Sequence, residues 1–324
     1  MNKRIYNFAR SELLQGRLRY LIVIALASFL CSQTIGTVEA ETGTATSSFL
    51  RIGVDARGVS MGGAQGASTD SVYSMYWNPA GLSNVLLREV GLTYFNAFQG
   101  LNYSFLGYAA PFEPYGTVAF QAFFLSSGSI TSTRENPDGS FAGTGDSFSV
   151  YDLGLGISQS KRITGGLSYG INLKLLAHKI RKEQAFALAA DAGIILQTVI
   201  EELKAAFVVQ NVSTKYSFIS QELREPLGFK LATVYSFIDK PLTLAADYNL
   251  VMHNRDTLNI GAEYWFLEMF AFRAGARLPS MAGFLSVFNL GFGMNWRELY
   301  ELDYSFSPHT ELGVNHRFSL IVRF

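Results

Sequence analysis

The sequence is poor in cysteine, in charge and in long apolar runs. Its one cysteine is Cys31, so the chain beyond it cannot form a disulfide or a thiolate zinc site. Charged residues make up only 16% of the 324 residues and aromatic residues 14%, a balance that argues against disorder. Beyond the N-terminal region no stretch approaches the roughly 18 consecutive apolar residues of a membrane-spanning helix. A helical membrane protein is therefore not expected.

The usual signs of catalysis and cofactor binding are also missing. The four histidines have no metal-ligand spacing, and there is no Gly-x-Ser-x-Gly elbow or phosphate-binding loop. The net charge of zero gives no indication of a nucleic-acid partner. We expect no enzyme activity, metal or cofactor. The enzymatic alternative would use His253 near Asp256, or His309 near Ser307 and Glu311, but neither set has the spacing of a triad.

The first 40 residues are typical of a secretory signal peptide. A basic region extends to Arg19, the apolar run 21–30 follows, and Val38-Glu39-Ala40 offers small residues for cleavage. The alternative, a membrane anchor, is disfavoured because this apolar run is too short to span a bilayer. A lipoprotein would need a small residue before Cys31, where Leu30 stands. We predict export across the inner membrane, with 1–40 removed.

From residue 88 onward the sequence alternates between apolar and polar residues. Leu290, Phe292, Met294 and Trp296, for example, alternate with glycine, asparagine and arginine. Successive side chains of a β-strand point to opposite faces, so strict alternation predicts strands. Fourteen strands are predicted, near 88–98, 101–110, 115–125, 147–158, 163–177, 186–197, 203–211, 227–237, 241–251, 256–266, 269–278, 286–296, 299–306 and 314–324.

The composition of the polar face of these strands distinguishes a membrane barrel from a soluble β-sandwich. It is rich in glycine and asparagine and has about one charge per strand: Asp152, Lys174, Asp191, Lys230, Asp247, Glu263, Arg273 and Asp303. The opposite face has aromatic residues toward the strand ends, which is the outer-membrane pattern. A sheet in lipid must close to remove its edges. We therefore predict an all-β fold, a transmembrane antiparallel β-barrel over 88–324 in the cell outer membrane, in contact with its lipid. The turn 266–269 is expected to be tight, and Ser126–Ser147 to be a long polar loop.

The last strand ends on an aromatic residue. Its apolar face is formed by Phe318, Leu320, Val322 and the final Phe324. This pattern resembles the signal read by the outer-membrane barrel assembly machinery, which we expect to be a partner of the chain.

Residues 41–87 do not alternate and contain many small residues. Asp70 can cap a short helix, and Asn78 can cap another with Pro79 at its first position, where a missing N–H costs nothing. Gly58, Gly62 and Gly63 permit tight turns and close backbone approach. A compact element of this composition is typical of a plug, or hatch, inside the barrel lumen.

The run Phe49–Leu82 resembles the N-terminal region of the PorV/PorQ family, which is similar to the FadL long-chain fatty-acid transporters. The matching residues are Gly53, Ala56-Arg57, Met61-Gly62-Gly63-Ala64, Asp70 and Trp77-Asn78-Pro79-Ala80-Gly81-Leu82. The resemblance implies a fourteen-stranded barrel with a hatch, and an Asn78-Pro79-Ala80 motif that anchors the hatch to the wall. The alternative is that these three residues only cap a helix. Arg57 could pair with a lumenal carboxylate such as Glu263 or Asp303.

Two functions follow from this resemblance. The FadL side implies transport of hydrophobic small molecules, with an apolar ligand bound near Arg57, Met61, Gly62, Gly63, Trp77, Asn78, Pro79 and Ala80. An apolar pocket between residues 50–82 and the wall would support it. The PorV side implies an accessory or shuttle role in type IX-like protein secretion and surface attachment, with secretion components as partners. We favour transport.

Overall fold

The computed structural model describes residues 48–96, 100–163, 166–218, 221–252, 254–278, 287–309 and 313–324. The predicted signal peptide, residues 1–40, lies outside these ranges, as do His253 and Glu311 of the enzymatic alternative. In the described part of the chain, none of the helices has the length and apolar character needed to cross a membrane.

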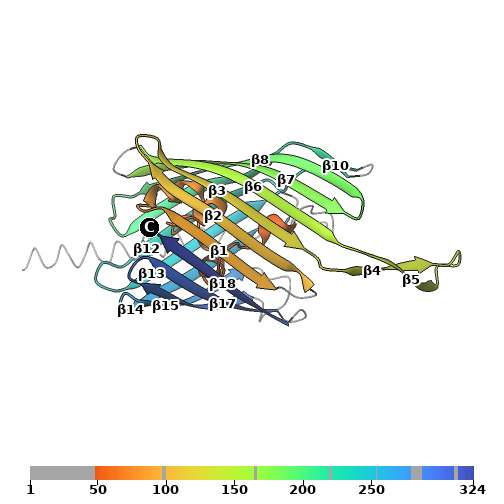
Figure 1. The fold of residues 1–324 in the computed structure, drawn as a ribbon. Coiled ribbons are helices and arrows are strands. Elements are labelled where there is room, and N and C mark those ends of the chain that lie inside the picture. The colour runs from red at the N-terminus through yellow and green to blue at the C-terminus, as the bar shows by residue number, and fades with distance from the viewer. Residues whose placement is uncertain are drawn as a thin grey trace, which may run out of the picture. The chain divides into compact units, whose positions relative to one another are not determined.

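Residues 89–323 form a closed antiparallel barrel (Figure 1). The order of its fourteen strands around the wall is β1-β18-β17-β16-β15-β14-β13-β12-β9-β8-β7-β6-β3-β2. Their bounds are β1 Glu89–Asn96, β2 Asn102–Phe112, β3 Gly116–Ser126, β6 Val150–Arg162, β7 Leu167–Ile180, β8 Glu183–Gln197, β9 Leu203–Ser213, β12 Gly228–Ser236, β13 Leu242–Val251, β14 Thr257–Phe266, β15 Phe270–Leu278, β16 Phe288–Trp296, β17 Tyr300–His309 and β18 Gly313–Arg323. The predicted fold class and all fourteen predicted strands are confirmed.

The first and last strands close the barrel. Their ladder runs from the pair Glu89↔Arg323 to the pair Tyr94↔Phe318. The N–H of Phe324 donates to the carbonyl oxygen of Arg88 at 3.0 Å, so the pairing reaches the final residue. Closure leaves no unpaired sheet edge along the wall.

The sparse charges of the alternating strands point inward. Seven of the eight predicted lumenal charges are buried, and the eighth, Asp152, is half-buried. The other face of the wall is apolar and exposed, as with Leu173, Leu290 and Phe318, each more than half exposed. A belt of this kind is far larger than the apolar patches of soluble monomers, and it matches the outward face of barrels that sit in lipid.

Two hairpins outside the wall were not predicted. Strands β4 (Ile130–Glu135) and β5 (Phe141–Phe148) pair with each other, and so do β10 (Tyr216–Phe218) and β11 (Gln221–Leu223). The long polar connection predicted over Ser126–Ser147 does link two wall strands, β3 and β6, but it contains a hairpin that was not predicted. The β4–β5 hairpin projects beyond the end of β3 and β6 (Figure 1), and its side chains are mostly exposed on both faces. Neither face of the hairpin is buried, so apolar alternation does not mark its strands, although the turn residues Asn136-Pro137-Asp138-Gly139 lie between them.

Residues 48–85 fold into four short helical turns that lie inside the barrel (Figure 1). These are η1 (Ser48–Arg51), α2 (Ala56–Ser60), α3 (Ser74–Trp77) and η2 (Pro79–Asn84). We call this segment the plug. Its apolar side chains form a buried core with the inward aromatic residues of β1, β2 and β3, including Phe95, Phe105 and Phe123.

One of the two predicted helix caps is correct. The Asn78 side chain accepts a hydrogen bond from the N–H of Ala80 at 3.0 Å, with Pro79 at the first position of η2. Asp70 caps no helix, because α3 begins after Tyr73 and has no side-chain cap. The cap that was missed is Asp55, which accepts from the N–H of Gly58 at the start of α2.

Candidate functional site

The plug meets the wall backbone to backbone on one side. Gly62 and Gly63 have φ values of 67° and 83°, a region that favours glycine. A Cβ on Gly62 would lie 2.6 Å from the backbone of Ala276 in β15. From the wall, a Cβ on Gly261 would lie 2.5 Å from the carbonyl oxygen of Met61. Gly261 faces Gly275 in the β14–β15 ladder, so two wall glycines form the flat surface on which Met61-Gly62 rests.

Asn78, Pro79 and Ala80 contact the wall on the opposite side and also cap η2. The Asn78 amide donates to the carbonyl oxygen of Gly66 within the plug at 2.6 Å and to that of Ile194 in β8 at 3.4 Å. The carbonyl oxygen of Ala80 accepts from the hydroxyl of Ser160 in β6 at 3.1 Å. Capping and wall contact are thus not alternatives, since the same three residues do both.

Arg57 connects the plug to a buried ionic network. Its guanidinium donates to Glu263 of β14 at 2.9 and 3.0 Å and to Asp70 of the plug at 2.6 Å. The predicted pairing with Glu263 is confirmed. Asp303, the other predicted partner, pairs with Arg273 instead.

The network continues along the wall beyond Arg57. Arg273 pairs with both Glu263 and Asp303. At the barrel seam, Arg323 bridges Glu301 and Glu89 at 2.7 and 2.8 Å. Every cation in this network has a carboxylate, which is the condition under which buried charges are tolerated.

Trp77 and Asp55 hold the centre of the plug together. The Trp77 indole N–H donates to Asp55 Oδ1 at 2.6 Å. Burial raises the pKa of Asp55, while the hydrogen bonds from Trp77 and Gly58 oppose the rise. Lys230 Nζ lies 5.2 Å above the Trp77 ring and 3.6 Å from Asp247, and Asp247 accepts from the N–H groups of Gln65 and Gly66.

Several arginines border the aromatic pair Tyr76 and Trp77, whose rings lie 4.8 Å apart at 89°. Burial raises the pKa of Tyr76 to about 12, against the nearby charges of Arg277, Arg317 and Arg51, which lower it. Arg51 and Arg317 were not among the predicted site residues. Arg317 could have been found, because it occupies an inward position next to Phe318 in the final alternating strand.

His178 of β7 lies between two carboxylates. Its Nδ1 is 2.7 Å from Asp152 and its Nε2 is 3.2 Å from Glu225, and its ring stacks on Tyr216 at 5.2 Å. This cluster joins the wall to the β10–β11 hairpin. Among the residues that the structure describes, no group of three or more His, Cys, Asp or Glu side chains could hold a metal ion.

Among the residues that the structure describes, one space between plug and wall is small and half polar. It has a volume of about 10 Å³ and is bordered by Leu50, Tyr76 and polar wall residues such as Gln121 and Lys174. That is room for about one water molecule. It does not provide the apolar pocket that the transport hypothesis expected at this place.

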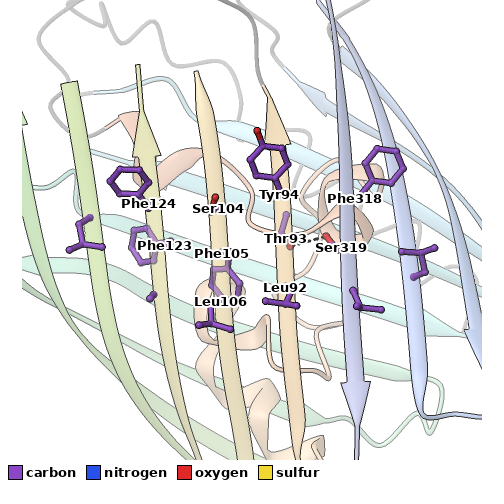
Figure 2. A pocket seen from close by; sticks show the side chains of 14 residues that line it. Leu92, Thr93, Tyr94, Ser104, Phe105, Leu106, Phe123, Phe124, Phe318 and Ser319 are labelled. Carbon is purple, nitrogen blue, oxygen red and sulfur yellow. Dashed lines mark hydrogen bonds between the residues drawn. The ribbon is translucent and has the colours of Figure 1, made fainter. Parts of the chain in front are cut away.

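A larger apolar groove lies on the outward face of β1, β2, β3 and β18 (Figure 2). Its volume is about 410 Å³. Tyr94, Phe124 and Phe318 border one end of it (Figure 2). The groove forms because Ser104, which faces Tyr94 and Phe124 in the ladders, is too small to fill the gap between them.

The predicted assembly signal borders the same groove and the seam. Phe318 and Phe324 are exposed on the outer face, with Leu320 and Val322 half-buried between their neighbours. Phe318 and Leu320 line the groove. Phe318, Leu320 and Val322 stand on one face of β18, as the alternation predicted, and Phe324 directly follows the strand.

Comparison with known proteins relates the chain to a group of channels by fold. No protein-family model matches it, and no curated protein matches it. The CymD monoaromatic hydrocarbon channel aligns with a TM-score of 0.63 at 14% identity, over 84% of this chain and 98% of that chain. The Ralstonia pickettii toluene transporter TbuX aligns at 0.61 and 15%, over 84% and 98%.

A FadL homologue from Pseudomonas aeruginosa also aligns, with a TM-score of 0.54 at 13% identity, over 83% of this chain and 97% of that chain. The FadL side of the resemblance is therefore confirmed at the level of fold, whereas the PorV/PorQ side stays a prediction. This chain has the fold of barrels that include channels for hydrophobic molecules.

Proposed function

We propose that the chain is an outer-membrane channel through which hydrophobic small molecules pass. The observation that carries the proposal is the combination of a closed fourteen-stranded wall, an apolar outer belt and a lumen occupied by a plug. An open porin would give polar solutes a continuous water path. A plugged lumen removes that path, which suits molecules that move between apolar surfaces.

Three features support this proposal. The outer belt gives the wall a face that is compatible with lipid. We accordingly propose outer-membrane lipid as a partner, together with the barrel assembly machinery. The fold is similar to that of proteins named as toluene transporters and a monoaromatic hydrocarbon channel. The plug meets the wall through Asn78-Pro79-Ala80 and Arg57, so its position can govern passage.

Uptake by cells tests the proposal. A bacterial strain that lacks outer-membrane transporters for toluene and carries this chain should accumulate radiolabelled toluene faster than the same strain with an empty vector. Asn78→Ala should change that rate, because it removes the bonds to Gly66 and Ile194. The matched control is Asn254→Ala, at a half-buried position between β13 and β14, where the side chain accepts from the N–H of Arg255 and makes no contact with the plug among the hydrogen bonds of the described residues. Unchanged toluene uptake with the intact chain and with Asn78→Ala would sink the proposal.

A role in type IX-like secretion is the second candidate. The observation in its favour is the β4–β5 hairpin, which projects from the barrel with Phe141 68% exposed. Such an arm offers both edge and side chains to a protein partner. Replacing residues 131–147 by a Gly-Ser turn should then abolish co-purification with secretion components and leave toluene uptake intact. Loss of uptake instead would assign the hairpin to the channel.

A further inference from the structure

The β10–β11 hairpin lies at the same end of the barrel as the β4–β5 hairpin (Figure 1), because β9 and β3 run in the same direction in the antiparallel wall. Outer-membrane barrels have their long connections on the extracellular side. Unlike the β4–β5 hairpin, this one turns apolar side chains toward the lumen. Tyr216 belongs to the buried cluster that contains Phe49 of the plug, and Phe218 and Leu223 pack against that cluster. The hairpin therefore lies over the plug at the extracellular end.

The hairpin is a small sheet of its own. Its two strands of three residues pair with each other and form no ladder with the wall among the residues that the structure describes. At its base, the N–H of Thr214 donates to the carbonyl oxygen of Leu188 in β8 at 2.9 Å. An isolated two-stranded hairpin is marginally stable in water. Its position over the plug therefore depends on the contacts that it makes inside the barrel.

His178 joins the hairpin to the wall and to the plug. Its Nδ1 lies 2.7 Å from Asp152 of β6, and its Nε2 lies 3.2 Å from Glu225, which follows β11. A neutral imidazole has a single N–H, so two ionised carboxylates are both satisfied only by the protonated ring. Tyr216 stacks on this ring at 5.2 Å, and the Phe49 ring lies 5.4 Å away at 79°. One side chain thus contacts all three parts of the molecule.

This contact stabilises a closed hairpin more than an open one. The Glu225 side chain is 0% exposed and that of His178 is 9% exposed. A buried carboxylate that loses its cation is strongly destabilised, whereas a carboxylate in water is solvated. Removing the imidazole therefore penalises the closed position, in which Glu225 is buried. It has little effect on an open position, in which Glu225 reaches water.

The hairpin also stands in the way of molecules that come from outside. Beneath it, the space between plug and wall beside Leu50 and Phe123 holds about one water molecule. The Phe123 ring lies 5.6 Å from that of Phe49, which in turn contacts His178. Because these aromatic side chains are packed together, access to the plug from the extracellular side requires the hairpin to move.

We infer that the β10–β11 hairpin is a lid on the extracellular end of the lumen, and that His178 is the latch that holds it closed between Asp152 of the wall and Glu225 of the hairpin. The lid opens when the bond between His178 and Glu225 breaks and Glu225 becomes solvated. This inference does not depend on which molecules pass through the barrel.

Cysteine labelling of the full chain in intact cells tests the lid. The sequence has one cysteine, Cys31, so Cys31→Ser gives a background without thiols. Ala187→Cys then places a thiol on the inward face of β8, in the cluster under the hairpin, where Ala187 is 2% exposed. Ser217→Cys is the matched reporter on the exposed side of β10. The reagent is a polyethylene-glycol maleimide too large to cross the outer membrane. We expect rapid labelling at 217 and slow labelling at 187.

The decisive variant is His178→Asn, which removes the cation and keeps a polar side chain. Labelling at 187 should accelerate about tenfold or more, because a buried carboxylate without its cation is strongly destabilised, while labelling at 217 should change less than twofold. Glu225→Gln should have the same effect from the side of the hairpin. His316→Asn is the matched control, since His316 is exposed on the outer face and bonds to Tyr304, and it should alter neither rate. Heat-modifiable gel mobility checks that each variant has folded.

Two results would overturn the inference. Equal labelling at 187 and 217 in the parent chain would show that the hairpin does not cover the lumen. An unchanged rate at 187 in folded His178→Asn and Glu225→Gln would show that the imidazole does not hold it. The channel can fail separately, because absent toluene uptake together with latch-dependent labelling would leave the lid and remove the channel.

Discussion

At the scale of single residues, the plug can lie against the wall because the glycines at this contact have no Cβ. Gly62 combines a positive φ with a backbone contact to Ala276. A side chain there meets two separate costs, one from its own backbone conformation and one from the wall. The two costs can be measured apart, because the chain has another glycine that carries only the first.

Gly62→Ala should destabilise the folded chain by about 2 kcal/mol or more, as strained backbone and overlap each cost about 1–3 kcal/mol. The comparison is Gly143→Ala, because Gly143 has a φ of 111° but nothing within 4 Å of an added Cβ. Urea unfolding in detergent gives both values. Equal losses in the two variants would show that the plug does not press on the wall.

Glu263 is the carboxylate on which two arginines depend. Glu263→Gln should cost about 3–5 kcal/mol, because it leaves buried Arg273 and Arg57 with one partner fewer each. Asp70→Asn removes the other partner of Arg57, but the Asp70 side chain is 49% exposed, so we expect a loss below about 1 kcal/mol. Urea unfolding of both variants decides the matter. A cost as small for Glu263→Gln as for Asp70→Asn would contradict the role of the network.

At the scale of elements, the tight turns of the barrel are built from unusual residues. Leu267 and Glu268 have φ values of 54° and 55°, and Arg297 and Glu298 have 56° and 60°. Two consecutive positive φ values define the hairpin turn that favours Asn-Gly. Non-glycine residues pay about 1–2 kcal/mol each for this conformation.

Leu267→Asn/Glu268→Gly should therefore raise the free energy of unfolding by about 1–2 kcal/mol. The same exchange at Arg297 and Glu298 should add a similar amount, because the two turns lie in different hairpins. Equilibrium urea titrations in detergent would measure the gain. No gain at either turn would mean that these residues have a use which offsets their strain.

The alternation of the sequence predicted the wall because lipid and lumen demand different side chains at neighbouring positions. It identified the inward Glu263 and Arg273 and the outward Phe318. The plug was harder to predict, because its conformation depends on contacts with strands far along the chain. Asp70 looked like a helix cap locally, yet its partner is Arg57. The β4–β5 hairpin was missed because neither of its faces is buried.

At the scale of the whole molecule, the apolar outer belt determines whether the outer face of the wall lies in lipid or in water. Leu290→Arg places a charge on that belt, where Leu290 is 54% exposed. In a lipid bilayer the substitution should cost about 2–4 kcal/mol, whereas an exposed leucine in water tolerates it within about 0.5 kcal/mol.

Folding into phosphatidylcholine vesicles, followed by urea titration, measures this cost. Ile130→Arg in the β4–β5 hairpin is the control, since Ile130 is 38% exposed on an element outside the wall. We expect the control to fold as the parent chain does. If Leu290→Arg were equally harmless in vesicles, the belt would not be facing lipid.

The fit of Met61-Gly62 against Gly261 and Gly275 also bears on how such barrels can be recombined. Where the backbone of the plug packs directly on the backbone of the wall, no side chain at the contact can adjust to a plug from another protein. A plug grafted from another barrel would fit here only if its own backbone were equally accessible where it meets the glycines of this wall. Chimaeras that exchange the N-terminal segment should therefore succeed or fail as sets, with strands β14 and β15 transferred along with it.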